Sequence, residues 1–211
     1  MSFPLPDNET DRLRALRSLR ILDTKPEERF DELTQLAAII CGVPISLISL
    51  IDADRQWFKS RYGLDAHETP RAHAFCTHAI MQREMFVVPD ATADDRFAQN
   101  PLVKGYHWRF YAGAPLATRD GNLLGTLCVI DHQPRVLTKE QKTALEILAR
   151  QVIANIELRS NLRELRDALT ARDAPEGDSE EASAGLDELI AELRAIASSL
   201  QAVREGRTPL R

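Results

Sequence analysis

Hydrophobic positions in the first forty residues recur at helical spacing. Over residues 8–20, leucines three apart alternate with arginines, which predicts a short amphipathic helix with a narrow apolar stripe. Residues 30–41 follow the helical period again, and Gly42 provides a stop signal. We therefore expect an N-terminal helical segment over residues 1–23 and a second helix before the first strand.

Beyond Gly42 the pattern changes to short β-branched and apolar runs, which are typical of strands. Residues 63–73 show no period and are predicted to form a loop, whereas residues 75–82 favour a two-turn helix. The polar residues 91–105 form a long connection, and such connections are usually functional or mobile. A compact core of helices and strands is expected over residues 24–137, with strands at 43–51, 56–60, 85–88, 108–117 and 123–130.

The helical period returns after residue 137 and predicts a long helix over 138–172. Thr138 and Gln141 have the spacing of a capping box. Further along, leucines alternate by four and three, the heptad pattern of a coiled coil, at Leu158, Leu162, Leu165 and Leu169. An acidic linker is expected over 173–185 and a second amphipathic helix with a frayed tail over 186–211. We expect the terminal helices to form a coiled-coil-like parallel homodimer.

Composition limits the partners. The 27 Lys and Arg against 32 Asp and Glu give a net charge of −5, which excludes the broad basic footprint of a typical nucleic-acid binder. No apolar run is long enough to cross a membrane, and the start of the chain lacks the pattern of a secretory signal. Three cysteines, an odd number in apolar settings, favour reduced thiols. These features predict a cytoplasmic protein that binds neither nucleic acid nor membrane.

Candidate chemistry is concentrated around residues 71–78. The chain has no glycine-rich nucleotide loop and no Gly-x-Ser-x-Gly motif. Arg71, His73, Cys76 and His78 form a cluster, but side chains two apart on a helix point away from each other. We therefore expect no metal site, and we favour Cys76 packing inward.

Aromatic residues on the expected strands leave two interpretations open. Trp57, Phe110 and Tyr111 either pack in the core or line a small-molecule pocket. Neighbours on a strand face opposite sides, so only one of Phe110 and Tyr111 can point into a given pocket. We favour Tyr111, because its hydroxyl group can fix the orientation of a ligand.

Four stretches together resemble the GAF domain family of small-molecule sensors, in its bacterial signalling versions. The similarity implies an antiparallel sheet flanked by helices, an α+β fold, with a pocket bounded by the helix at 75–82 and the loop at 91–105. The stretches are PEERFDELTQLAAIICGVPISLISLIDADRQWFKS at 26–60, FCTHAI at 75–80, FVVPDATADDRF at 86–97 and RFYAGAPLATRDGNLLGTLCVID at 109–131.

Three known GAF subclasses fit the sequence poorly. The acidic pair of the cyclic-nucleotide signature is replaced by Ala114-Pro115, and the Cys-His dipeptide that attaches bilins is replaced by Cys76-Thr77-His78. Free methionine-(R)-sulfoxide reductases have a cysteine where Cys76 stands and another in the following loop, but residues 91–105 contain none. We therefore expect no methionine sulfoxide reductase activity.

The leading interpretation is a non-enzymatic sensory module in signal transduction. It would bind an unidentified small ligand, or sense redox state, and signal through dimeric helices to an output protein in trans; the sequence names no cofactor. One alternative is a divergent thiol enzyme using Cys76, with Cys128 as resolving residue, and another is a dimerisation scaffold whose pocket is filled by its own side chains. The expected ligand-binding residues are Trp57, Cys76, His78, Asp90, Arg96, Phe110, Tyr111 and Cys128.

Overall fold

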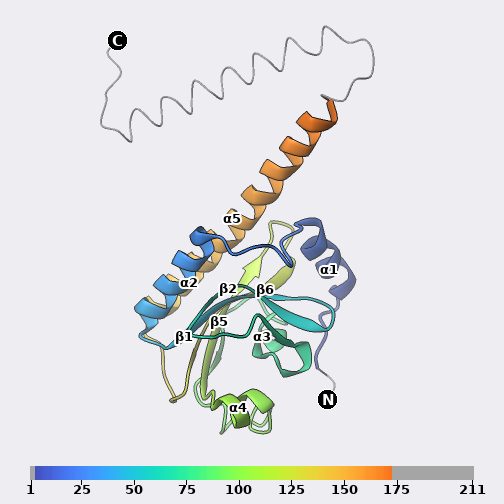
Figure 1. The fold of residues 1–211 in the computed structure, drawn as a ribbon. Coiled ribbons are helices and arrows are strands. Elements are labelled where there is room, and N and C mark those ends of the chain that lie inside the picture. Colours follow the sequence, from blue (N-terminus) through green and yellow to red (C-terminus); the bar gives the residue numbers. More distant parts are fainter. Residues whose placement is uncertain (1–2, 173–211) are drawn as a thin grey trace, which may run out of the picture. The chain divides into compact units, whose positions relative to one another are not determined.

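One antiparallel sheet organises the part of the chain that the computed structural model describes, residues 3–172 (Figure 1). The strand order is β3-β2-β1-β6-β5-β4. The strands are β1 (Ile45–Ile51), β2 (Arg55–Tyr62), β3 (Glu68–Pro70), β4 (Phe86–Val88), β5 (Phe110–Ala117) and β6 (Leu123–Asp131). The helices are α1 (Glu9–Ser18), α2 (Glu28–Cys41), η1 (Arg71–His73), α3 (Phe75–Ala79), α4 (Pro101–Tyr106) and α5 (Lys139–Arg172). This confirms the predicted α+β fold.

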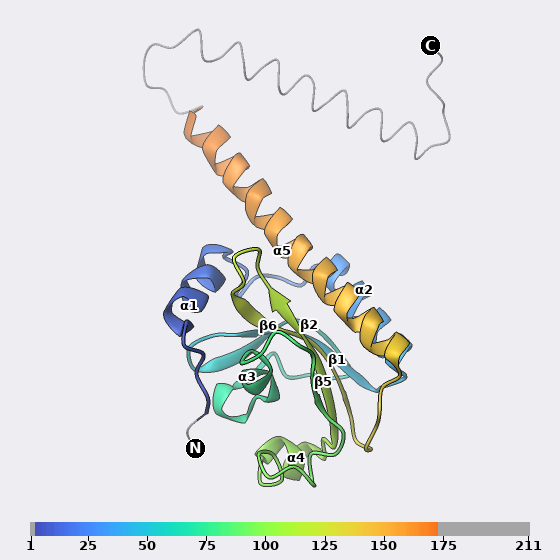
Figure 2. The same cartoon turned by 180° about the vertical axis from the view of Figure 1, so that it is seen from behind.

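Different helices cover the two faces of the sheet (Figures 1 and 2). On the face that we call the helical face, α2 and α5 pack on side chains such as Ile48, Leu50 and Leu127. On the opposite face, the α3 face, α3 and the segment around α4 pack on Leu47 and Cys128. Residues up to Leu165 form one compact unit, and α5 residues from Arg166 onward belong to a second unit.

The start of α5 is fixed by the predicted capping box. The backbone N–H of Thr138 donates to Gln141 Oε1 over 3.0 Å, and the N–H of Gln141 donates to Thr138 Oγ1 over 3.2 Å. Gln141 Nε2 also donates to the carbonyl oxygen of Ile40 over 3.0 Å, so one side chain caps α5 and joins it to the end of α2. The capping box is therefore confirmed.

Two segments predicted as connections contain short elements. Residues 63–73 include β3 and η1, and α4 begins inside residues 91–105. Asn100 starts α4, because its Oδ1 accepts from the N–H of Leu102 over 2.9 Å while Pro101 occupies the first turn. Asn100 Nδ2 also donates to the His73 carbonyl over 3.0 Å. The pair Asn100-Pro101 is typical of a helix start, but the turn-rich composition of residues 91–105 favoured the prediction of a loop.

The helix predicted over 75–82 is shorter than expected. The α-helix ends at Ala79. Beyond it, backbone hydrogen bonds connect residues three apart, as in a 3-10 helix: the N–H of Met81 donates to His78 O and the N–H of Gln82 donates to Ala79 O. Other element boundaries differ from the predicted ones by a few residues. The linker at 173–185 and the helix at 186–211 lie outside the described residues. Among residues 3–172, no helix is long and apolar enough to span a membrane.

Candidate functional site

The Cys76 thiol lies at the centre of the α3 face, within a group that we call the thiol cluster: Cys76, Tyr111, Thr126 and Cys128. Tyr111 Oη and Thr126 Oγ1 donate to Cys76 Sγ over 3.2 and 3.1 Å. The Sγ atoms of Cys76 and Cys128 are 4.0 Å apart. All four side chains are buried, with at most 2% exposed. Helix α3 and strands β5 and β6 thus bring together groups that are far apart in the sequence.

Hydrogen bonding sets the charge of this cluster. Burial alone would raise the pKa of Cys76, but hydrogen bonds from Cys128, Thr126 and Tyr111 outweigh it and lower the pKa to about 7. Burial, reinforced by the neighbouring Cys76, raises the pKa of Tyr111 and of Cys128 well above their ordinary values. Cys76 is therefore the member of the cluster that ionises first as the pH rises, while Tyr111 and Cys128 stay neutral.

We expect the Cys76 thiol to titrate with a midpoint near pH 7, measured in the full chain by the ultraviolet absorbance of the thiolate. Tyr111→Phe should raise the midpoint because the thiolate loses a donor, and Cys76→Ser should abolish the transition. Cys41→Ser is the matched control, because burial raises the pKa of Cys41 to about 11. A wild-type midpoint near pH 9 would contradict the assignment.

The position of the Tyr111 ring depends on a neighbouring glycine. Tyr111 and Gly113 lie on the same side of β5, and a Cβ atom at position 113 would come within 2.2 Å of Tyr111 Oη. Phe75 holds the ring from above, with the two ring centroids 5.2 Å apart. Any side chain at Gly113 would therefore force the tyrosine hydroxyl group out of the position in which it bonds to Cys76.

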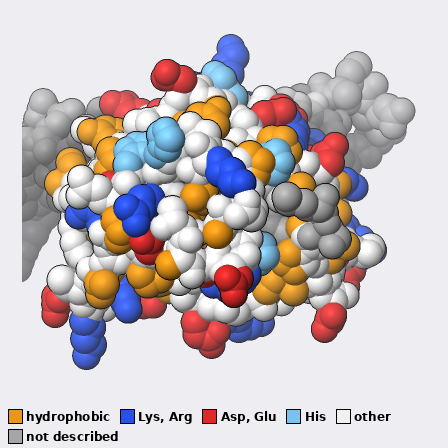
Figure 3. Space-filling view, turned by 90° about the horizontal axis from the view of Figure 1, so that it is seen from below, with side chains coloured by type: hydrophobic (Ala, Val, Ile, Leu, Met, Phe, Trp, Pro, Cys, Tyr) orange, Lys and Arg blue, Asp and Glu red, His pale blue; other side chains and the backbone are white. Residues whose placement is uncertain are grey.

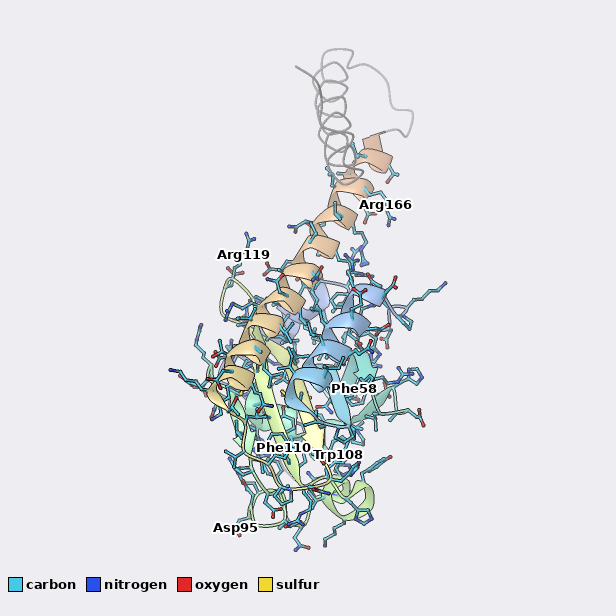
Figure 4. The ribbon with its side chains drawn as sticks, turned by 90° about the vertical axis from the view of Figure 1, so that its left-hand side faces the viewer. Phe58, Asp95, Trp108, Phe110, Arg119 and Arg166 are labelled. Carbon is cyan, nitrogen blue, oxygen red and sulfur yellow. The ribbon has the colours of Figure 1, made fainter. Side chains whose placement is uncertain are left out.

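Aromatic side chains close the cluster from outside. We call Phe75, Phe86, Phe97 and Trp108 the aromatic cover; Phe75 and Phe97 stack with their centroids 4.1 Å apart and their planes 12° from parallel. The cover includes an orphaned donor, since Trp108 Nε1 is buried and has no hydrogen-bond partner among the described residues. Figure 4 shows Trp108 near the sheet and Asp95 at the outer end of the segment that carries α4.

The polar residues expected in the pocket lie around this cover instead of beside the thiols. His78 is edge-on to Phe97, with the ring centroids 4.9 Å apart, and its burial lowers its pKa. The Arg96 guanidinium lies 5.3 Å from the centroid of the Phe97 ring. Asp90 forms an ion pair with Arg109. This pair anchors the start of the connection at 91–105, which we call the covering segment. On the surface at this end of the molecule, acidic and basic side chains are interspersed (Figure 3).

The structure corrects two of the expected ligand-binding residues. Trp57 and Phe110 pack on the helical face with the α2 and α5 side chains, so they cannot line a pocket with Cys76. Their strand neighbours Phe58 and Tyr111 point to the α3 face. Tyr111, not Phe110, is therefore the residue of that pair beside Cys76.

Sequence reasoning missed five members of the site, namely Thr126 and the four residues of the aromatic cover. Thr126 lies two residues before Cys128 on β6, and the strand period could have placed both on one face. Phe75, Phe97 and Trp108 come together only through tertiary packing, and nothing in their spacing indicates it. Within residues 3–172, no group of three or more His, Cys, Asp or Glu side chains could hold a metal ion.

Comparison with known proteins identifies the family to which this fold belongs. The model of the GAF domain matches residues 25–156. A cyclic di-GMP phosphodiesterase of Pseudomonas aeruginosa is 46% identical over 155 residues, which are 72% of this chain and 26% of that protein. The chain thus spans about a quarter of the length of this curated relative.

Solved structures agree on the fold. The GAF domain of an Acinetobacter phosphoenolpyruvate-protein phosphotransferase matches with a TM-score of 0.53 and 18% identity, over 76% of this chain and 99% of that one. The type II free methionine-R-sulfoxide reductase of Thermoplasma acidophilum matches with a TM-score of 0.52 and 11% identity, over 61% and 90% of the two chains. The chain therefore belongs to the GAF domain family, and its role is that of a sensory domain in signalling.

Proposed function

We propose that this GAF domain is a non-enzymatic module that binds a small ligand on the α3 face, between the thiol cluster and the aromatic cover. Ligand binding shifts the covering segment and thereby changes the packing of α5. Such a shift requires that the ligand bind one of the two arrangements more tightly than the other. Similarity to a cyclic di-GMP phosphodiesterase supports an output that controls cyclic di-GMP turnover, in the same protein or in trans.

The observation that carries this proposal is the orphaned Trp108 Nε1. A buried donor without a partner costs about 1–3 kcal/mol, which a hydrogen-bond acceptor on a ligand would recover. Phe97 stacks on Phe75 in the manner of a flat ligand, and Phe97 belongs to the connection at 91–105 that shifts in the proposed mechanism. Cys76 and Tyr111 lie directly beneath this stack. The pocket is thus occupied by the protein's own Phe97 side chain until a ligand displaces it.

Native mass spectrometry of the chain purified from its own host tests the proposal, since it reports bound mass and oligomeric state together. We expect a bound small molecule that is lost in Trp108→Phe and retained in Trp57→Phe, because Trp57 faces the other side of the sheet. Equal retention in both variants would place the ligand elsewhere. A bare mass from the native host would favour a scaffold.

We also propose that the chain forms a parallel homodimer through α5, the expected role of Leu158, Leu162, Leu165 and Leu169. The side chains of Leu158, Leu162 and Leu165 are 50, 55 and 47% exposed, although burying a leucine is worth about 1.5–3 kcal/mol. Changing these three to glutamate in the full chain should give a monomer in sedimentation velocity. Val136→Glu, at an 84% exposed position, should leave the dimer intact. A triple variant that stays dimeric would move the interface elsewhere.

One observation favours a second candidate, a thiol oxidoreductase. Cys76 has a lowered pKa and lies 4.0 Å from Cys128, the arrangement of an attacking and a resolving thiol. Thioredoxin-coupled reduction of free methionine sulfoxide tests this candidate. We expect no turnover, because Cys76 is only 2% exposed. Turnover that disappears in Cys76→Ser would favour the enzyme.

A further inference from the structure

Two buried arginines meet where α1 contacts the turn between β1 and β2. Arg12 is fully buried and Arg71 is 1% exposed. Both bond to one carboxylate, that of Glu9: Arg12 Nε donates to Oε2 over 2.8 Å and Arg71 Nη1 donates to Oε1 over 2.6 Å. Arg12 Nη1 also donates to the carbonyl oxygen of Ile51 over 2.6 Å. The second arginine is far less well satisfied than the first.

The Arg71 side chain donates its hydrogen bonds through one nitrogen, Nη1. Besides Glu9, that nitrogen contacts the carbonyl oxygens of Asp52 and Ala53 at 2.9 and 3.3 Å. Arg71 Nε and Nη2 are buried and have no partner in the described part of the chain. These two nitrogens form one edge of the guanidinium plane, the edge that pairs with two oxygens of a carboxylate or phosphate. The free edge therefore has the geometry of an oxyanion receptor.

The net charge of Glu9, Arg12 and Arg71 also favours the binding of an anion. Glu9 contributes one negative charge, whereas Arg12 and Arg71 contribute two positive charges, so one positive charge is left over. The Asp52 carboxylate is paired with Arg55 and Arg17, at 3.4 and 3.9 Å. A buried charge is stable when it is paired and fully hydrogen-bonded. An anion at the free edge of Arg71 would meet both conditions.

The start of the chain covers this position. The Phe3 ring lies over the face of the Arg71 guanidinium, with 5.0 Å from Cζ to the ring centroid, and leaves the edge unpaired. Residues 3–8 run past α3 in both ribbon views (Figures 1 and 2). A cavity of about 340 Å³ beside this segment is lined by Pro6, Asp7, Asn8, residues 80–83, Gly121 and Leu123. For an anion to enter, this segment has to move aside.

We propose that the Nε–Nη2 edge of Arg71 binds the oxyanion group, carboxylate or phosphate, of a small molecule, and that Phe3 closes over it. The anion site at Arg71 uses no residue of the thiol cluster, so its test is independent of the function proposed above. With Phe3 in place the anion is shielded from water, which strengthens its pairing with the guanidinium.

Thermal unfolding of the full chain in sodium phosphate, sodium succinate and sodium chloride, at matched ionic strength, tests the proposal. Phosphate or succinate should raise the melting temperature saturably above the value in chloride, and the anion that does so identifies the class. Arg71→Lys keeps the charge but loses the two-nitrogen edge, and it should weaken binding about tenfold. Arg14→Lys, whose side chain is 73% exposed, is the matched control.

Phe3→Ala provides a second measurement that does not depend on the stability of an Arg71 variant. It removes the cover but keeps the edge, so the apparent affinity for the stabilising anion should change while Arg14→Lys leaves it unaltered. The proposal is overturned if stabilisation is the same in all three salts or does not saturate. It is also overturned if folded Arg71→Lys binds as the wild type does, or if Phe3→Ala leaves the affinity unchanged.

Discussion

Glu27→Gln is expected to lower the free energy of unfolding by about 2–3 kcal/mol at pH 7. Lys59 Nζ, on a fully buried side chain, donates to Glu27 Oε1 over 2.7 Å, and Arg159 Nε of α5 donates to the same oxygen over 3.0 Å. Glutamine removes the negative charge and leaves the buried ammonium group with neutral acceptors alone, the amide oxygen of the new side chain, Thr24 Oγ1 and Lys25 O. Urea unfolding of the full chain measures the change.

The loss should depend on pH. Burial alone would raise the pKa of Glu27, but hydrogen bonds from Lys59 and Arg29 outweigh it and lower the pKa from 4.5 to about 2. The folded-state pKa is the lower one, so the stabilisation is complete above pH 4.5 and disappears as the pH falls through about 2. The difference between wild type and Glu27→Gln should therefore shrink toward pH 2. Glu32→Gln, on the exposed side of α2, should stay within about 0.5 kcal/mol of the wild type.

Gly125→Ala is expected to destabilise the fold by at least about 3 kcal/mol, the upper end of the range for overpacking. A Cβ atom at this position in β6 would lie 1.9 Å from the carbonyl oxygen of Ser49 in β1. Gly125 pairs with Leu50, so relief requires the two central strands to separate. Urea or thermal unfolding of the full chain measures the loss.

Gly105→Ala is the matched control for Gly125→Ala. Gly105 lies in α4, and a Cβ atom there would meet nothing within 4 Å. Alanine is a better helix former than glycine, so this variant should gain up to about 1 kcal/mol. A Gly125→Ala protein as stable as the wild type would mean that the β1–β6 pairing differs from the one described.

The main helices and strands could be predicted from the sequence, because each has a local pattern of apolar residues or caps. Strand β1 follows a run of apolar and β-branched residues, and α5 begins at a capping box whose two bonds are both present. Short elements such as β3 lack such signals, since three residues are too few to show a period. Their positions follow from pairing with β2, which is a tertiary effect.

The side-chain directions in the site could not be predicted, because they depend on strand register. The pairing of β1 with β2 shifts between Ile48 and Ser49, which places one extra residue, Lys59, opposite the shift. Lys59 consequently reaches Glu27, just before α2, and Ser60 reaches Asp31 in α2, a result that strict alternation excludes. Similarly, Cys76 and Cys128 are 52 residues apart in the chain, and only the packing of α3 on β6 brings their sulfur atoms together.

The paired hydrogen bonds of Asn100 have a kinetic consequence. One side chain both starts α4 and ties it to η1, so neither contact can break without weakening the other. The amides of Val103 and Lys104 bond back to Asn100, and the amide of Trp108 bonds to Leu102. In native-state hydrogen exchange these three amides should open together as one sub-global unit, at a lower free energy than the amides of β5 and β6. The α4 segment, together with Trp108, would then be a part of the molecule that opens while β5 and β6 stay intact.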